Sequence, residues 1–278
     1  MRVAAVGHVE WVEFAEVERL PRPGEIINAR RVWSEPAGGA AVAAVQLAKL
    51  AGGHGLFFTS LGDDELGHTA KRGLEELGLT VHVAWRRNQP TRRAFTYVDD
   101  DHERTITVIG ERLEPHGGDP LPWDQLGEVD ACYFTAGDAA AVRAARAAGA
   151  LTATARVLPV LQDAGVLLDA VVGSGADAKE QYVDGMLDPA PRHVVRTAGG
   201  RGGVWVGEEG RSGRWEAAEL PGPRADAYGC GDSFAAGLTY GLGDGRGIEA
   251  ALRLGALCGA WCFTGHGPYE RQLRDPDT

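Results

Sequence analysis

The alternation of short apolar stretches with longer helical patterns is the strongest constraint on the fold of this chain. Val3–Val6 and Leu56–Leu61 read as buried strands, and Glu65–Leu77 has the spacing of a helix that ends at Gly78. Strands that alternate with helices favour a parallel sheet with helices on its faces. The same patterns predict strands at 81–85, 131–135, 150–155, 167–172, 193–197 and 203–206, and helices at 40–50, 232–242 and 247–263.

Two pairs of segments do not fit this alternation and look like exposed strands. They are Trp11–Phe14 with Ile26–Trp33, and Ala94–Val98 with Thr105–Ile109. The polar run Asp99–His102 joins the second pair and suits a hairpin turn. We therefore expect a single domain over residues 1–278, with the strands of a small extra sheet inserted at about 9–33 and 91–110.

The composition is that of an ordinary water-soluble protein, with 44% hydrophobic and 24% charged residues. A net charge of −11 argues against nucleic acid and anionic membranes as partners. The start of the chain lacks a signal-peptide pattern, and no apolar run is long enough to span a bilayer. The four cysteines include no C-x-x-C pair and read as reduced thiols, so the expected location is cytoplasmic.

The segment Asp226–Gly237 carries the clearest chemical signal. Small residues, including Gly229, Cys230 and Gly231, lead directly into Asp232 and an apolar helical pattern. Backbone N–H groups at a helix start have no intrahelical partner and favour an anion, and a neighbouring carboxylate can take a proton. These are the minimum parts for phosphoryl transfer, although an ordinary glycine turn with a helix cap explains the same residues equally well.

Along nearly its whole length the chain resembles the PfkB, or ribokinase, family of carbohydrate kinases. The stretch Asp226–Gly237 is similar to the family signature D-T-x-G-A-G-D-x-F-x-x-G, and Gly38-Gly39 before a helix is similar to its N-terminal signature. Further marks agree in order and spacing: Leu20–Glu25, Gly62–Asp64 with Gly67, Thr91-Arg92, Thr197–Gly199 with Gly202, and Gly265–Gly267.

The resemblance implies an α/β fold, a ribokinase-like doubly wound sheet flanked by helices, with a small β-sheet lid over the sugar. It implies transfer of the γ-phosphate of ATP to a hydroxyl of a sugar or sugar-like molecule, with Asp232 as the base and Gly229, Cys230 and Gly231 as the anion hole. The residues implied to bind the nucleotide are Thr197, Gly199, Gly202 and Gly265. Asp177 and Glu180, similar to the family's N-x-x-E motif with Asp for Asn, would hold Mg²⁺ through water, or form a helix cap.

The expected sugar site departs from the family pattern. The implied substrate residues are Glu10, Val12, Gly38, Gly39, Ala43, Arg92 and Arg104. Val12 replaces the Asp, and Ala43 the Asn, with which the family holds sugar hydroxyls, and neither can make such a hydrogen bond. Three explanations stay open: an unusual acceptor, a shifted register in which Glu13 supplies the carboxylate, or loss of sugar phosphorylation.

Other functions and partners are left open by the sequence. The rivals to a kinase are a non-catalytic nucleotide or sugar sensor on the same fold and, more weakly, a dinucleotide-dependent oxidoreductase suggested by the G-x-G-x-x-A match at Gly173–Ala178. The family resemblance allows a homodimer formed through the lid. A monovalent cation is also allowed, but Asp226-Ala227-Tyr228 departs from the usual pattern at that loop.

Overall fold

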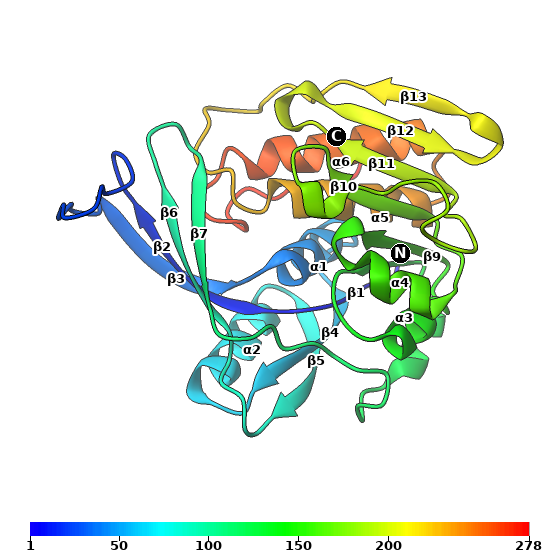
Figure 1. Ribbon diagram of the computed structural model, residues 1–278, viewed down its shortest axis with the longest axis horizontal. Coiled ribbons are helices and arrows are strands. Elements are labelled where there is room, and N and C mark those ends of the chain that lie inside the picture. Colours follow the sequence, from blue (N-terminus) through cyan, green and yellow to red (C-terminus); the bar gives the residue numbers. More distant parts are fainter. Residues whose placement is uncertain (278) are drawn as a thin grey trace.

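A sheet of nine strands forms the centre of the molecule, in a computed structural model that describes residues 1–277 (Figure 1). Its spatial order is β13 (Ser212–Trp215), β12 (Gly203–Gly207), β11 (His193–Thr197), β10 (Ala170–Ser174), β9 (Ala150–Thr154), β8 (Ala131–Phe134), β1 (Val3–Val6), β4 (Gly55–Gly62) and β5 (Leu79–Arg86). The strands from β11 to β5 are parallel. The strand order reverses at β1 and β8, and ligands of such sheets bind at the carboxyl ends of strands beside this point.

Helices cover both faces of this sheet. One core cluster contains α1 (Gly39–Leu50), α2 (Glu65–Glu76), α5 (Cys230–Gly243) and α6 (Ile248–Cys262), and the other contains α3 (Ala139–Ala145) and α4 (Leu158–Ala164). Side chains of β1 alternate between the two, with Val3 and Ala5 in the first and Ala4 and Val6 in the second. Within residues 1–277, no helix has both the length and the apolar character needed to cross a membrane.

A second sheet of four strands projects from one end of the main layer (Figure 1). Its order is β3 (Arg31–Ala37), β2 (Glu10–Glu16), β6 (Arg93–Val98) and β7 (Arg104–Ile109). The central pair β2–β6 is parallel, and the two outer pairs are antiparallel. We call this sheet the lid. The predicted α/β fold with a small separate sheet is therefore confirmed.

The structure corrects some of the predicted boundaries. The predicted strand Ile26–Trp33 begins only at Arg31, and Ile26 is almost fully exposed, so it has no partner to bury it. The last two strands of the main sheet run antiparallel to their neighbours, and β13 was not predicted at all. Its sequence, Ser212–Trp215, has only one strongly apolar side chain, so the hydrophobic pattern is too weak to reveal an edge strand.

Candidate active site

Two helix N-termini meet at the end of the lid, and neither has a side-chain cap. Helix α5 begins after Gly229, whose φ of 79° places it in the left-handed region that favours glycine, and no side chain caps it. Helix α1 begins after Gly38, again without a side-chain cap. A Cβ on Gly39 would lie 2.7 Å from Oδ1 of Asp232, so only glycine lets the start of α1 approach this carboxylate. Free N–H groups of two helices thus point into one region.

Asp232 is a half-buried carboxylate in the first turn of α5. Burial raises its pKa to about 6, and the nearby carboxylates Glu180 and Glu10 act in the same direction. The guanidinium groups of Arg104 and Arg156 oppose this rise. A carboxylate with such a pKa is ionised at neutral pH and is a stronger base than an exposed aspartate, which suits proton transfer.

Asp226 connects the loop before α5 to the segment around Gly267 through hydrogen bonds. Its fully buried side chain accepts hydrogen bonds from the backbone N–H of Tyr228 at 2.8 Å and of Gly267 at 3.1 Å. The lid touches the same loop, because the carbonyl of His102 accepts a 3.1 Å hydrogen bond from the N–H of Ala227. The lid and the helix start are therefore held in a fixed relation, with Asp226 as a structural residue.

Glu10, at the start of lid strand β2, lies in a buried polar cluster with His8 and Arg92. Its Oε1 is 3.1 Å from Nε of Arg92 and 3.9 Å from Nε2 of His8. The His8 side chain is only 13% exposed. Burial together with nearby arginines lowers the pKa of His8 to about 3, so its ring is neutral at physiological pH. Burial raises the pKa of Glu10, and Arg92 and Arg112 oppose this rise.

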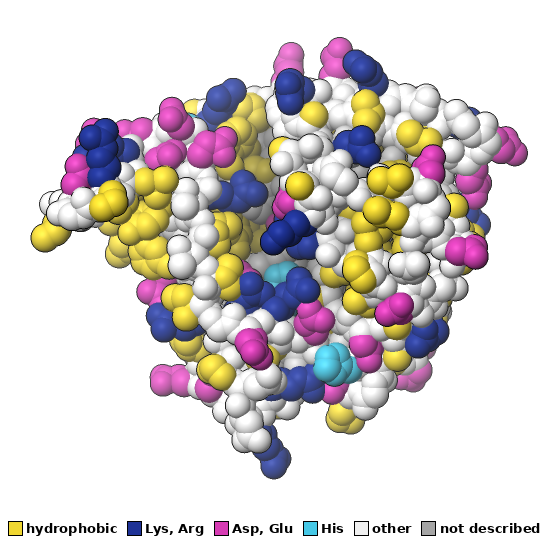
Figure 2. Space-filling model, in the orientation of Figure 1, with side chains coloured by type: hydrophobic (Ala, Val, Ile, Leu, Met, Phe, Trp, Pro, Cys, Tyr) yellow, Lys and Arg dark blue, Asp and Glu magenta, His cyan; other side chains and the backbone are white. Residues whose placement is uncertain are grey.

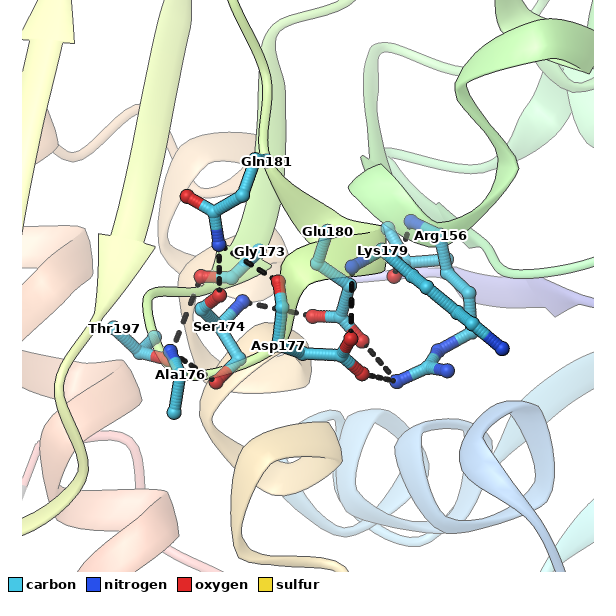
Figure 3. A network of polar contacts seen from close by, with 10 residues as sticks. Arg156, Gly173, Ser174, Ala176, Asp177, Lys179, Glu180, Gln181 and Thr197 are labelled. Atoms are coloured by element: carbon cyan, nitrogen blue, oxygen red, sulfur yellow. Dashed lines mark hydrogen bonds and ion pairs between the residues drawn. The ribbon is translucent and has the colours of Figure 1, made fainter.

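The predicted magnesium residues form a compact network with an arginine (Figure 3). One oxygen of Asp177 lies 2.7 Å from Nη2 of Arg156, and one oxygen of Glu180 bonds to the same nitrogen. Their other oxygens accept backbone hydrogen bonds, from Lys179 to Asp177 at 2.9 Å and from Ser174 to Glu180 at 2.7 Å. Two carboxylates therefore converge on one point that a positive charge occupies.

Not every predicted substrate position reaches the site. Val12 and Ala43 are completely buried within the hydrophobic core that joins the lid to α1, so neither exposes surface to a ligand. Gly38 and Gly39 lie against Glu10 and Asp232 respectively, and Arg92 contacts Glu10. Arg104, at the start of β7, is exposed but close enough to Asp232 to lower its pKa. The proposed alternative carboxylate, Glu13, instead pairs with Arg93.

Three of the residues predicted to bind the nucleotide lie at and after the end of β11. The fourth, Gly265, follows α6, and a Cβ there would lie 2.9 Å from the backbone nitrogen of Arg271. The hydroxyl of Thr197 donates a 3.5 Å hydrogen bond to the carbonyl of Gly173, and Gly199 has open space where a side chain would stand. Gly202 packs against β13, since a Cβ there would lie 1.9 Å from the carbonyl oxygen of Trp215. A cleft of about 550 Å³ is lined by Trp205, Trp215 and residues 249–257 of α6, but none of the predicted site residues lines it.

Sequence reasoning missed His8, Arg112, Arg156 and the role of Tyr228. The hydroxyl of Tyr228 accepts a 3.2 Å hydrogen bond from the N–H of Gly38, which connects the two glycine segments directly. His8 and Arg156 each follow the carboxyl end of a parallel strand, β1 and β9, and that position is a signal that could have found them. Arg112 follows an exposed lid strand, and the sequence offers no comparable signal for it.

Comparison with known proteins identifies the family. The model of the pfkB family carbohydrate kinases matches residues 1–165 and 168–274. The ATP-dependent ribose-1-phosphate kinase of Halopiger xanaduensis is 29% identical over 94% of this chain and 91% of its own length. Among solved structures, a putative ribokinase from Agrobacterium tumefaciens covers 98% of this chain and 94% of its own, at 20% identity and a TM-score of 0.81. The structure of Arabidopsis thaliana ribokinase complexed with ribose and ATP covers 99% of this chain and 96% of its own, at 18% identity and a TM-score of 0.73.

These matches decide between the functions that the sequence left open. The two structural likenesses are below 25% identity and establish the fold, whereas the family model spans almost the whole chain. The dinucleotide-dependent oxidoreductase is thereby set aside, because the G-x-G-x-x-A match lies inside a kinase fold. The chain belongs to the PfkB family of carbohydrate kinases and is an ATP-dependent phosphotransferase that acts on small sugar-like molecules.

Proposed function

We propose that Asp232 is the base of the kinase reaction and that the start of α5 is its anion hole. The acceptor hydroxyl would give its proton to Asp232 as its oxygen attacks the γ-phosphorus of ATP. The bond from that phosphorus to the bridging oxygen of ADP would break, leaving ADP and the phosphorylated acceptor. The observation that carries this proposal is the position of Asp232 Oδ1, in contact with Gly39 where two uncapped helix N-termini converge.

The backbone N–H groups of Cys230, Gly231 and Asp232 would bind the transferring phosphoryl group. They lie in the first turn of α5 and have no hydrogen-bond partner among the described residues. A Cβ on Gly231 would meet nothing within 4 Å, so a ligand can approach this turn closely. We assign Thr197, Gly199, Gly202 and Gly265 to the nucleotide. The open space at Gly199 and the place of the first three residues at or after the carboxyl end of β11 support this assignment, whereas Gly265 is assigned from the family resemblance.

Asp177 and Glu180 fit a hydrated Mg²⁺ in charge and in ligand type. Mg²⁺ prefers oxygen ligands and is often bound by one or two carboxylates together with substrate phosphates. The two carboxylates already converge on one cationic nitrogen of Arg156, which a bound metal would displace. When bound there, the metal would neutralise charge on the ATP phosphates. The monovalent cation stays a prediction.

We also propose that a second copy of the chain binds at the lid. Strand β7 is an edge strand with all six residues exposed, and Ile106, Val108 and Ile109 present apolar side chains. An exposed edge with apolar residues favours pairing with another strand, and a two-fold axis lets one such edge pair with its copy. A cytoplasmic location is supported by the cysteines, because all four are free thiols.

Kinetics of Asp232→Asn test the catalytic assignment. ADP release is measured across free sugars, sugar phosphates, sugar acids and nucleosides with Mg²⁺-ATP, and ATP binding is measured by calorimetry. We expect kcat to fall by about 10²- to 10⁴-fold, the usual contribution of a general base, with unchanged ATP affinity. Asp163→Asn, an exposed carboxylate on α4, is the matched control and keeps full activity. Equal turnover by Asp232→Asn and the control would refute the role of Asp232.

A further inference from the structure

The proposed site forms where the first turns of α1 and α5 meet, so its geometry depends on what holds these two turns together. Gly39 of α1 approaches Asp232 of α5 so closely that a Cβ on Gly39 would lie 2.7 Å from Oδ1 of Asp232. A shift of either helix would change this contact. A displacement of about 1 Å at a reacting group can cost about 100-fold in rate, so the contact matters for catalysis.

One side chain outside both helices is hydrogen-bonded to both first turns. Gln272 lies in the C-terminal segment after α6. Its Nε2 donates hydrogen bonds to the carbonyl of Val42 at 3.0 Å and to Oγ of Ser233 at 3.3 Å. Val42 is the fourth residue of α1, and Ser233, which directly follows Asp232, is the fourth residue of α5. The two amide hydrogens of Gln272 therefore link equivalent positions of the two helices.

The two residues that Gln272 holds are bonded in turn to the glycines before their helices. The N–H of Val42 donates to the carbonyl of Gly38 at 3.0 Å. The N–H of Ser233 donates to the carbonyl of Gly229 at 2.8 Å. The hydrogen bonds of Gln272 are thereby connected to both glycine turns of the site.

Gln272 is too deeply buried to contact a substrate itself. It is only 4% exposed and Ser233 is completely buried, so neither lines the hollow that Figure 2 shows between the lid and the main layer. Any influence of Gln272 on the reaction must therefore pass through the two helix starts. The orientation of its amide is fixed by its partner, because the Val42 carbonyl accepts hydrogen bonds and cannot donate one.

Gln46 provides a close comparison within the same chain. It is completely buried in α1, one turn after Val42, and its Nε2 donates a 2.8 Å hydrogen bond to the carbonyl of Leu273. Like Gln272, it has a buried Oε1 without a partner among the described residues. Its side chain makes no hydrogen bond to α5 within residues 1–277. Gln46 thus shares the burial, the chemistry and the partner segment of Gln272 but not the link between the helices.

We propose that Gln272 is a positioning residue of the kinase reaction, which holds the first turn of α1 against that of α5 and keeps Asp232 aligned with the acceptor hydroxyl. This inference rests on the proposed function of Asp232 as the base. Alignment of the base matters most in the transition state, so losing it lowers kcat more than it raises KM.

Gln272→Met tests this role, with Gln46→Met as the matched control. Methionine is also unbranched and flexible but has no N–H donor, so it removes both hydrogen bonds of Gln272 while still filling the space. It also removes the unpaired Oε1, so losses and gains in stability partly offset each other. We expect Tm to change by less than about 4 °C in either variant.

The kinetic readout uses Mg²⁺-ATP and the acceptor with the highest kcat/KM in the ADP-release screen. We expect kcat of Gln272→Met to fall by about 10- to 100-fold, with the KM for both substrates changed by less than about 3-fold. Gln46→Met keeps the kcat of the wild type. Ser233→Ala removes the acceptor on the α5 side of the same link, and it should lower kcat by about 3- to 10-fold, as expected for one neutral hydrogen bond.

A stability comparison needs no substrate and separates this inference from the proposed function. Asp232→Asn removes a carboxylate that burial destabilises, so it should raise Tm at pH 8. If Gln272 holds the two turns together, Gln272→Met lets water reach Asp232, and Asp232→Asn then raises Tm by no more than about half as much. The full rise should remain in the Gln46→Met background.

The outcomes distinguish the two proposals. Retained turnover by Asp232→Asn refutes the base, and the Tm comparison then decides on Gln272 alone. Equal kcat of the two methionine variants, a loss that appears in KM, or the same rise in Tm in all three backgrounds would overturn the positioning role of Gln272.

Discussion

Replacing Asp232 with asparagine should stabilise the folded protein above pH 6, although it removes the proposed base. In the folded chain burial raises the pKa of Asp232 from 3.8 to about 6. Ionised Asp232 therefore destabilises the fold. A difference of about 2 pH units corresponds to about 3 kcal/mol at most, since each unit is worth about 1.36 kcal/mol.

The raised pKa of Asp232 determines both the direction of the stability change and the pH range in which it appears. Because the folded pKa lies above the unfolded one, the penalty is complete above about pH 6 and disappears as the pH falls towards 3.8. Asp232 keeps partial contact with solvent, so we expect Asp232→Asn to gain about 1 to 3 kcal/mol at pH 8, or about 2 to 5 °C in Tm for a chain of this length. Near pH 4.5 the gain should be only about a third as large.

Thermal and urea unfolding at pH 8 and pH 4.5 measure this gain. Asp163→Asn serves as the control, because its carboxylate is exposed and its replacement should change Tm little at either pH. A variant Asp232→Asn that is no more stable than the wild type at pH 8 would show that the carboxylate is not destabilised by burial. An equal gain at both pH values would show that the effect is not electrostatic.

Four further predictions follow from the site. If ionised Asp232 is the base, kcat/KM falls about tenfold per pH unit below about pH 6, and a flat profile from pH 8 to 5 contradicts this. Gly39→Ala should lower kcat/KM by about 100-fold because its Cβ would meet Asp232, whereas Gly247→Ala, with open space around it, should behave as wild type. Arg156→Gln should lower the Mg²⁺ concentration for half-maximal rate, since it removes the cation that occupies both carboxylates, and an increased requirement would contradict that view. Val108→Lys should convert a dimer into a monomer in light scattering at micromolar concentration; a wild-type chain that is already monomeric would refute the lid dimer.

The sequence predicted the architecture well where elements carry strong periodic patterns. The strands at Val3–Val6 and His193–Thr197 have the predicted bounds, and the ends of α1, α5 and α6 differ from the prediction by at most two residues. Edge strands with a weak hydrophobic pattern were predicted poorly: β13 was missed, and the start of β3 was placed too early. An edge strand needs few apolar residues, and its extent depends on the neighbouring strand that pairs with it.

The sequence by itself determined that Gly229–Asp232 begins a helix with free N–H groups beside a carboxylate, because glycine turns and helix starts are local features. Only the tertiary structure decided what surrounds that carboxylate. Segments more than 190 residues apart bring Gly39 against Asp232, and the lid brings Arg92 against Glu10. The raised pKa of Asp232 arises from burial, and the Glu10–Arg92 ion pair joins residues distant in the chain, so no local pattern encodes either of them.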